Sequence, residues 1–170
     1  MIKRALILTA LLALAASGCV GQVRAVPLYP NHGQRLGHDK LAMLQGPIGT
    51  VDGQDVEAMG ASFELLPGCH LVTLRSKIGE GNERGAWTAD LHPMLFAFKM
   101  KPGYLYAFEY RAEFGSAGHG QLFMTARELD ASGATVSLLL PSRDGRDIDE
   151  CRSWGQAYYS PASQTNPPPR

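Results

Sequence analysis

The chain has no surplus of charge of either sign. Its 170 residues include 16 Lys and Arg and 16 Asp and Glu. Removal of residues 1–18 as a leader would leave 14 basic against 16 acidic side chains. A polybasic surface for nucleic acid or anionic lipid is therefore excluded, because such surfaces need a clear excess of Lys and Arg. We expect no nucleic acid among its partners.

Motifs for nucleophilic catalysis and for metal binding are missing as well. Neither Gly-x-Ser-x-Gly nor Ser-x-x-Lys occurs, and no two histidines have the His-x-x-x-His spacing. We therefore predict no catalytic residue, no bound metal and no cofactor. The alternative is a metal-binding or hydrolytic site assembled in space from His70, His92, His119 and acidic residues near the C-terminus. The two remaining histidines, His32 and His38, are expected in solvated loops.

The densest acidic cluster lies just before Cys151. It contains Asp144, Asp147, Asp149 and Glu150. Their spacing lacks the regular oxygen ligands and the glycine of an EF-hand loop. Arginines at positions 143, 146 and 152 neutralise the cluster. We expect a surface loop held by ion pairs rather than a calcium site.

Long hydrophobic runs are confined to the start of the chain. Lys3 and Arg4 precede an uncharged stretch from Ala5 to Ala16, as in a secretory signal peptide. Helical residues over this stretch would rise about 18 Å, short of the roughly 30 Å hydrocarbon core of a bilayer. The pattern predicts a signal peptide over residues 1–18 and no membrane span.

The segment Leu14-Ala15-Ala16-Ser17-Gly18-Cys19 leads through small residues directly into a cysteine. It resembles the lipobox of bacterial lipoproteins. The resemblance implies cleavage before Cys19, a diacylglycerol on its sulfur and an acyl chain such as palmitate on its new amino group. Several chains anchor a protein stably, because each buried methylene contributes about 0.8 kcal/mol. The alternative is an ordinary signal peptide, with Cys19 a plain thiol.

The residue after Cys19 bears on which membrane holds the lipid. In lipoproteins of this type an Asp at that position resembles a retention mark for the inner membrane, and Val20 stands there instead. The resemblance therefore implies the outer membrane, with the protein facing the periplasm. An envelope protein or a cell-wall component is then the expected partner.

Two further cysteines remain, Cys69 and Cys151. An even number in an oxidising compartment favours a disulfide. A loop of about 80 residues closed in this way would stabilise the fold by roughly 4 to 5 kcal/mol in the chain-entropy model. A catalytic thiol with His70 as its base is disfavoured, because neighbouring side chains of a strand point to opposite faces. We predict that Cys69 and Cys151 pair.

Alternation of large apolar and smaller or polar residues predicts strands at residues 94–100 and 104–110. A Pro-Gly pair between them is a turn signal. A hairpin with a three-residue loop would set Phe96 opposite Phe108 and keep the large side chains on one face.

Other turn signals separate shorter strands. Asp52-Gly53 and Asp130-Ala131-Ser132-Gly133 each predict a hairpin. The expected strands are 48–51 with 54–56, and 121–129 with 135–140. At Pro67-Gly68, the register of the later Pro-Gly turn would place Cys69 on the side of Leu65. His70 would lie on the other face, where a histidine with satisfied hydrogen bonds is the usual case.

Seven or eight short strands with turns about every ten residues predict a mainly β fold, a single antiparallel β-sandwich over residues 40–158. The Gly- and Pro-rich segment 19–39 predicts a flexible tether behind the lipidated cysteine, and the Pro-rich segment 159–170 a disordered tail. No helix longer than two turns is expected.

The order of Val51-Asp52-Gly53, Leu66-Pro67-Gly68 and Pro102-Gly103 resembles small extracytoplasmic β-sandwich domains of bacterial lipoproteins. These include PEGA-like modules and related families of unknown function, and no catalytic residues come with the resemblance. We expect a lipid-anchored envelope protein that acts as a non-enzymatic binding or assembly module. Aromatic residues near loops or at the end of the domain form the candidate recognition patch: Trp87, Trp154, Tyr158 and Tyr159.

Overall fold

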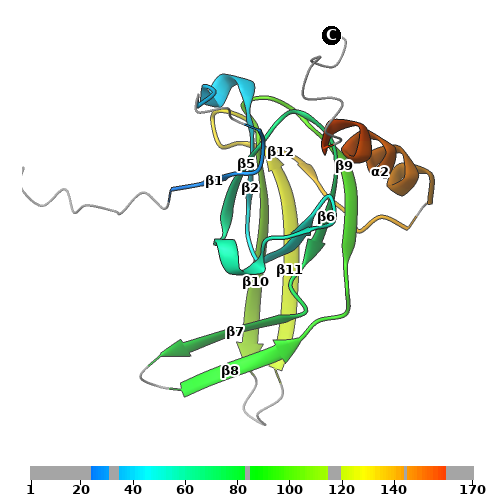
Figure 1. Cartoon of the computed structure of the whole chain (residues 1–170). Coiled ribbons are helices and arrows are strands. Elements are labelled where there is room, and N and C mark those ends of the chain that lie inside the picture. Colours follow the sequence, from blue (N-terminus) through cyan, green and yellow to red (C-terminus); the bar gives the residue numbers. More distant parts are fainter. Residues whose placement is uncertain (1–23, 31–34, 83–84, 115–119, 144, 160–170) are drawn as a thin grey trace, which may run out of the picture.

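The computed structural model describes residues 24–30, 35–82, 85–114, 120–143 and 145–159 (Figure 1). The protein is mainly β, as the sequence predicts, and antiparallel pairing dominates in its sheets. The expected signal peptide, Cys19 and tail residues 160–170 lie outside the described residues.

The strands form sheets of six, four and two. The six-stranded sheet has the order β1 (Val26–Pro27), β5 (Ser62–Leu65), β2 (Ala42–Gln45), β10 (Leu105–Phe114), β11 (Gly120–Leu129) and β12 (Thr135–Leu138). The four-stranded sheet has the order β4 (Gln54–Asp55), β3 (Ile48–Val51), β6 (Gly68–Leu74) and β9 (Leu95–Met100). The third sheet is the hairpin of β7 (Lys77–Asn82) and β8 (Gly85–Asp90). The helical segments are η1 (His38–Lys40), η2 (Glu57–Met59) and α2 (Gly145–Tyr159).

This arrangement differs from the expected seven or eight antiparallel strands. The described part holds twelve strands, and two pairings, β1 with β5 and β2 with β10, are parallel. The two-residue strand β1 is too short to show alternation, and glycines interrupt the pattern of β7. For these reasons the sequence pattern underestimates the number of strands.

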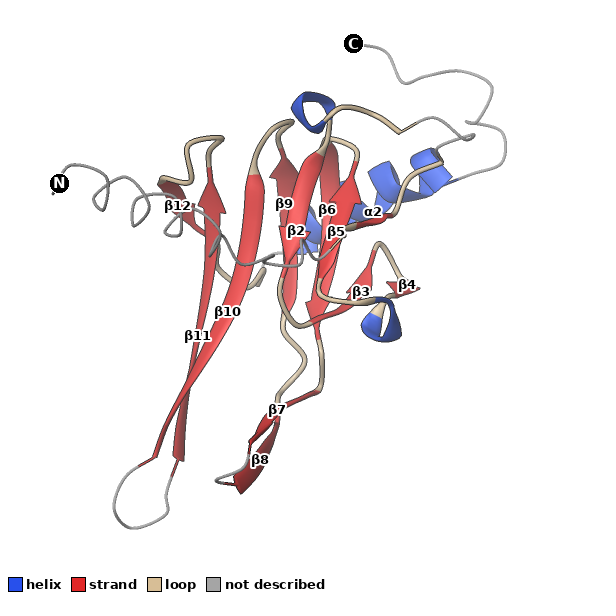
Figure 2. Cartoon of the chain, turned by 90° about the vertical axis from the view of Figure 1, so that its left-hand side faces the viewer, coloured by secondary structure: helices blue, strands red, loops and turns tan. Residues whose placement is uncertain are grey.

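Both larger sheets contribute to one hydrophobic core (Figure 2). Leu44, Phe63, Tyr106 and Phe108 enter it from the six-stranded sheet, and Val51, Val72, Phe96 and Met100 from the four-stranded sheet. Aromatic rings make contacts between the two sheets. Phe96 meets Phe108 edge to face with ring centroids 4.9 Å apart, and Phe98 stacks on Tyr106 at 5.2 Å. Such pairs add about 0.5–1.5 kcal/mol each beyond the area that they bury.

The expectation of a hairpin between β9 and β10 is wrong. β9 pairs with β6, whereas β10 pairs with β2 and β11, so the Pro102-Gly103 connection carries the chain from one sheet to the other. Phe96 and Phe108 do face each other, but across the core. Alternation identifies which face of β9 and of β10 is buried. A hairpin and a crossing between sheets would bury these same faces, so the pattern cannot distinguish the two arrangements.

The two hairpins expected at the other turns are confirmed. Asp52 and Gly53 have φ values of 51° and 83°, and they join β3 to β4. Such angles are typical of the tight turn that an Asp-Gly pair favours. Asp130 begins the turn between β11 and β12, where its carboxylate accepts hydrogen bonds from the backbone of Ser132 and Ala134.

The segment 19–39, expected as a flexible tether, is partly built into the fold. Val26 pairs with Phe63, and Leu28 and Tyr29 are buried. Leu28 also donates its backbone N–H to Glu64 O at 2.8 Å. Packing against β5 orders this stretch, which carries no periodic signal of its own.

Three residues of the acidic cluster expected as a loop, Asp147, Asp149 and Glu150, lie in the first turns of α2, a helix of 15 residues. Ile148, Cys151 and Trp154 are the described α2 side chains that are not exposed. Their spacing of three places them on one face of the helix, which packs on β6 and β9. With so few apolar residues, the helix depends on this tertiary contact and on its disulfide.

The outer ends of β10 and β11 project beyond the core, next to the β7–β8 hairpin (Figures 1 and 2). Trp87 of β8 contacts Tyr110 and Phe114 of β10 edge to face, with ring centroids 6.0 and 5.8 Å apart. The hairpin shares no ladder of hydrogen bonds with either larger sheet. We call these projecting elements the arms; they comprise residues 77–82, 85–90, 110–114 and 120–124.

Candidate functional site

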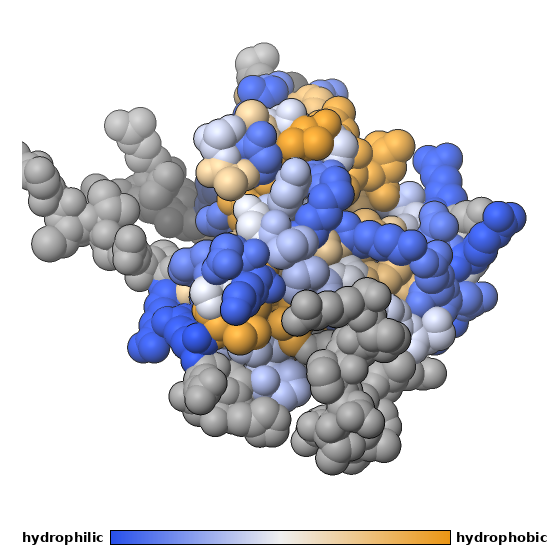
Figure 3. Space-filling view, turned by 90° about the horizontal axis from the view of Figure 1, so that it is seen from above, coloured by the Kyte–Doolittle hydropathy of each residue, from blue (hydrophilic) through white to orange (hydrophobic). Residues whose placement is uncertain are grey.

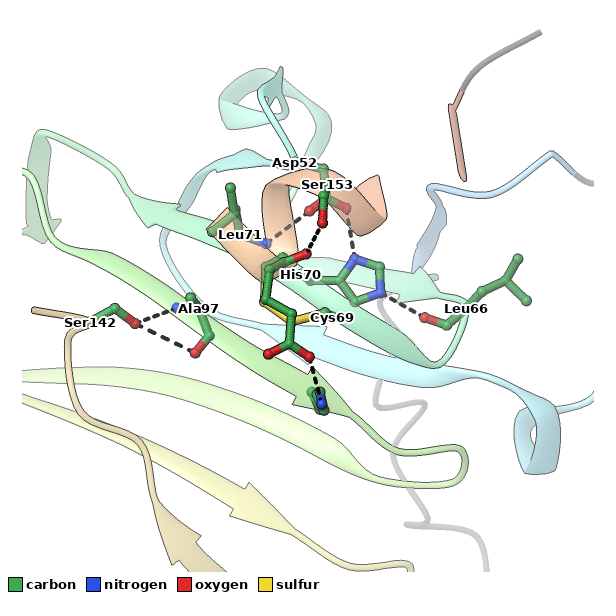
Figure 4. Close-up of a disulfide and its surroundings, with 11 residues drawn as sticks. Asp52, Leu66, Cys69, His70, Leu71, Ala97, Ser142 and Ser153 are labelled. Atoms are coloured by element: carbon green, nitrogen blue, oxygen red, sulfur yellow. Dashed lines mark hydrogen bonds and ion pairs between the residues drawn. A yellow bond between two sulfur atoms is a disulfide. The ribbon is translucent and has the colours of Figure 1, made fainter. Parts of the chain in front are cut away.

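A buried His–Asp pair lies where the Asp52-Gly53 turn meets β6 (Figure 4). His70 Nδ1 lies 2.7 Å from Asp52 Oδ2, and the two side chains are 1% and 3% exposed. The other carboxylate oxygen of Asp52 accepts the backbone N–H of Leu71 at 2.8 Å. The turn thus aims one carboxylate at two donors of β6.

The second ring nitrogen of His70 is also engaged. Nε2 lies 2.8 Å from the backbone oxygen of Leu66. A carbonyl oxygen accepts hydrogen bonds only, so Nε2 carries a proton. One further proton lies between Nδ1 and Asp52, because a ring nitrogen and a carboxylate oxygen 2.7 Å apart need a donor. In this arrangement His70 joins the turn to the start of β6 and presents no ring nitrogen to solvent, as expected for a structural histidine.

Helix α2 covers this pair. The ring of Trp154 lies edge to face against His70, with centroids 5.2 Å apart. It also fills the space beside Gly68, where a Cβ would lie 2.0 Å from the indole. Gly68 has φ 152°, a conformation that side chains rarely adopt. A glycine at this position therefore allows both the strand conformation and the close approach of Trp154.

The predicted disulfide joins Cys69 of β6 to Cys151 of α2. The sequence places Cys69 on the side of Leu65, toward the core; the structure corrects this, since Val72 and Leu74 face the core and Cys69 lies on the alternate face, toward α2. β5 and β6 belong to different sheets, so the register assumed for a hairpin does not apply.

Ion pairs are present at the acidic cluster, as expected, but they lie on a helix rather than in a surface loop. Glu150 of α2 lies 2.7 Å from Lys99 Nζ, and Asp149 pairs with Arg152 one turn later at 2.8 Å. The hydrogen bond to Glu150, together with its charge, raises the pKa of Lys99. These pairs are exposed and contribute little to stability; the disulfide and Trp154 hold the helix.

A second buried polar cluster surrounds Glu128 of β11, which is 7% exposed. Its carboxylate contacts Lys101 Nζ at 2.8 Å and accepts hydrogen bonds from Ser137 Oγ at 2.8 Å and Tyr106 Oη at 3.2 Å. Tyr106 Oη also accepts the backbone N–H of Lys101 at 2.8 Å. Burial raises the pKa of Tyr106, which keeps its hydroxyl a donor. The cluster fastens the crossover between the sheets to β11 and β12.

Burial by itself would raise the pKa of Glu128, but the hydrogen bonds from Lys101, Ser137 and Tyr106 and the charge of Lys101 outweigh it, so this pKa is lowered. The hydrogen bond to Glu128 and its charge raise the pKa of Lys101. Both shifts favour the charged forms.

The residues of the candidate recognition patch do not share one surface. Trp87 belongs to β8 in the arms, whereas Trp154 belongs to α2 and packs against His70. Figure 1 shows β8 and α2 far apart in the molecule. Tyr158 and Tyr159 lie at the end of α2, and their side chains are outside the described part. The two tryptophans lie at different ends of the molecule because one belongs to a strand of the arms and the other to α2. The sequence shows only that each residue is near a loop, not where that loop lies in the fold.

Those of the dispersed acidic residues and histidines that the structure describes are likewise not gathered into one site. His38 is exposed in η1 and His92 is exposed after β8, whereas His32, His119 and Asp144 lie outside the described residues. Among the described residues, no group of three or more His, Cys, Asp or Glu side chains could hold a metal ion. Within the same residues, no helix combines the length and the apolarity needed to cross a bilayer.

The roles of Asp52 and Glu128 are not among the predictions from the sequence. Asp52 was recognisable as a turn residue, but nothing local connects it to His70, 18 positions later. Glu128 does have a signal: alternation along β11 places it on the same face as Met124 and Ala126, which pack in or against the core. An acidic residue at a core-facing position predicts a buried polar cluster.

Replacement of Asp52 by Ala should destabilise the fold strongly. His70 Nδ1 and the Leu71 N–H would lose their acceptor while still buried, so we expect the free energy of unfolding to fall by about 3–5 kcal/mol. Urea denaturation measures it. Asp55→Ala is the matched control, because its carboxylate accepts one exposed bond, from Glu57 N; it should cost less than about 1 kcal/mol. Equal losses would refute the role of Asp52.

Removal of the disulfide in a Cys69→Ser/Cys151→Ser variant should lower the free energy of unfolding by about 4–5 kcal/mol, since the bridge spans 82 residues. Hydrogen exchange should rise first in α2. The control is Arg152→Ser, on the exposed side of the helix, which should leave exchange in α2 unchanged within error. Recovery of two free thiols from the native protein by non-reducing alkylation would contradict the bridge.

Glu128 should make the stability depend on pH. Its pKa is lower in the folded chain than in the unfolded chain, so its contribution is present above the ordinary carboxyl range and is lost as the pH falls through the folded pKa. Glu128→Gln should therefore show a smaller loss of stability than the wild type between about pH 5 and pH 3. Denaturation at a series of pH values measures this. Glu57→Gln, exposed on η2, is the control; identical slopes for Glu128→Gln and the wild type would exclude the effect.

No family model, curated protein or solved structure matches the chain. Its function is therefore inferred from the residues and contacts described above.

Proposed function

We propose that this chain is a lipoprotein of the cell envelope, anchored by lipid on Cys19 and facing the periplasm from the outer membrane. Its body is a β-sandwich that acts as a binding or assembly module without catalysing a reaction. The partner is an envelope protein or a component of the cell wall.

The observation that carries the binding role is the aromatic surface of the arms. Trp87, Tyr110 and Phe114 pack together there, yet Phe114 remains 58% exposed, and Phe123 on the other face of β11 is 43% exposed. Exposed aromatic groups are typical of sites where another molecule binds. Of the residues in the candidate recognition patch, we therefore propose Trp87 as the one that contacts the partner.

The geometry of the chain fits an anchor at Cys19. Val26, the first residue of β1, follows Cys19 by seven positions, a stretch that reaches about 25 Å when fully extended. An anchor there would keep the β1 side of the body close to the lipid headgroups. The arms project from the lower end of the body in Figure 1, away from β1, and would be presented to partners beyond the membrane surface.

The opposite end of the body has a different surface. Figure 3 shows it from above, with apolar patches interleaved with strongly hydrophilic side chains.

The disulfide between Cys69 and Cys151 supports an oxidising compartment such as the periplasm, because such bonds persist where thiols are not kept reduced.

Two variants test the proposal. Cys19→Ser in the full chain should, once residues 1–18 are cleaved, move the protein from the membrane fraction to the soluble periplasmic fraction, because the mature chain then lacks its acyl anchor. Retention in washed membranes of this variant with residues 1–18 removed, as checked by mass spectrometry, would refute the anchor. Trp87→Ala should abolish the partner that is captured by in-cell crosslinking and purification of the wild-type chain.

Leu36→Ala is the matched control for the arms, since Leu36 is 38% exposed and lies outside them. It should retain the captured partner. If the wild-type, Trp87→Ala and Leu36→Ala chains all capture the same partner, the arms are excluded as the binding surface.

A further inference from the structure

β12 is an unprotected edge strand. It ends the six-stranded sheet, and no described strand pairs with its outer side. Residues 135–140 contain no charge, no glycine and no proline. Val136, Leu138 and Leu140 are 51%, 66% and 79% exposed. Natural edge strands usually carry lysines, prolines or inward charges that prevent pairing with another chain, and β12 has none of these.

The backbone of Leu138 is directed toward this open side. Leu139 donates its N–H to Ala126 O of β11 at 2.9 Å. Successive residues of an antiparallel strand alternate between bonds to the neighbour and bonds away from it. The N–H and C=O of Leu138 therefore point away from β11, at the middle of the exposed apolar run.

We propose that β12 pairs in antiparallel fashion with β12 of a second copy of this chain. A twofold axis at Leu138 lets the Leu138 residues of the two copies exchange two N–H···O=C bonds. Val136 of each copy then lies opposite Leu140 of the other, on the same face of the joined sheet. Because the run is uncharged, the symmetric pairing places no like charges opposite each other.

The opposite edge of the sheet limits the assembly to two copies. That edge is β1, which has two residues, one of them Pro27, and proline cannot donate to a ladder of hydrogen bonds. Pairing through β12 is therefore isologous and closed, since the other described edge of the six-stranded sheet offers a third copy no comparable strand.

A bilayer fits the exposed leucines less well than a second copy does. Burial of Leu138 in hydrocarbon would leave its N–H and C=O without partners, and each such group is costly in lipid. A second β12 satisfies both the apolar side chains and the backbone. The proposal does not rest on the lipid anchor, although anchored copies would meet more often because they share one membrane plane.

Photocrosslinking tests this pairing. A benzoylphenylalanine at position 140 of the full chain, irradiated in cells, should give a product of twice the chain mass whose joined peptides both come from this chain. Leu138→Lys should reduce that product by about tenfold or more, because two lysines would then face each other at the axis. Met59→Lys is the matched control, since Met59 is 40% exposed on η2; the yield should stay at the wild-type level.

Every other outcome overturns the proposal. These outcomes are a crosslink to another protein, a crosslink to lipid, no crosslink, or an unchanged yield in a Leu138→Lys chain that still forms the Cys69–Cys151 disulfide. The purified Cys19→Ser chain, concentrated in solution, should give the same product. If only the anchor proposal is wrong, the cell fraction that contains the protein changes but the crosslinked dimer still forms. If the pairing proposal is wrong, the crosslinked dimer is missing from both the wild-type and the Cys19→Ser chain.

Discussion

The packing of aromatic faces between the two larger sheets is the contact on which the rest of the structure depends. Phe96 and Phe98 enter from β9, and Tyr106 and Phe108 enter from β10. Because the two strands are consecutive in the chain, their connection has to cross from one sheet to the other. That crossing leaves β9 to pair with β6 and β10 to pair with β2 and β11, and so places the two strands in different sheets.

Buried polar groups fasten the margins of this core. Asp52 and His70 connect a turn to β6 beneath Trp154, and Glu128 connects the sheet crossover to β11 and β12. Each group has its hydrogen-bonding partners close by, which matters because an unpaired polar atom in the interior is costly. The disulfide and Trp154 then hold α2, a helix with too few apolar residues to be stable by itself.

These contacts separate a rigid body from the surfaces that we propose for binding. The arms extend beyond the core and present aromatic side chains, and β12 presents an uncharged edge on the same sheet. An anchor near β1 would leave both surfaces accessible along a membrane. Association in the membrane plane through β12 and contact with an envelope partner through the arms would therefore not compete for the same residues.

By itself, the sequence determined the mainly β class, the buried faces of β9 and β10, the Asp52-Gly53 and Asp130 turns and the pairing of Cys69 with Cys151, because alternation, turn chemistry and cysteine count are local or compositional signals. It could also have shown Glu128 as a core-facing acid. The partner of each strand, the role of β1, helix α2 and the Asp52–His70 pair were decided only by the tertiary structure. Alternation indicates which face of a strand is buried, but not which element packs against that face. A contact between two residues far apart in the chain leaves no signal in the sequence around either residue.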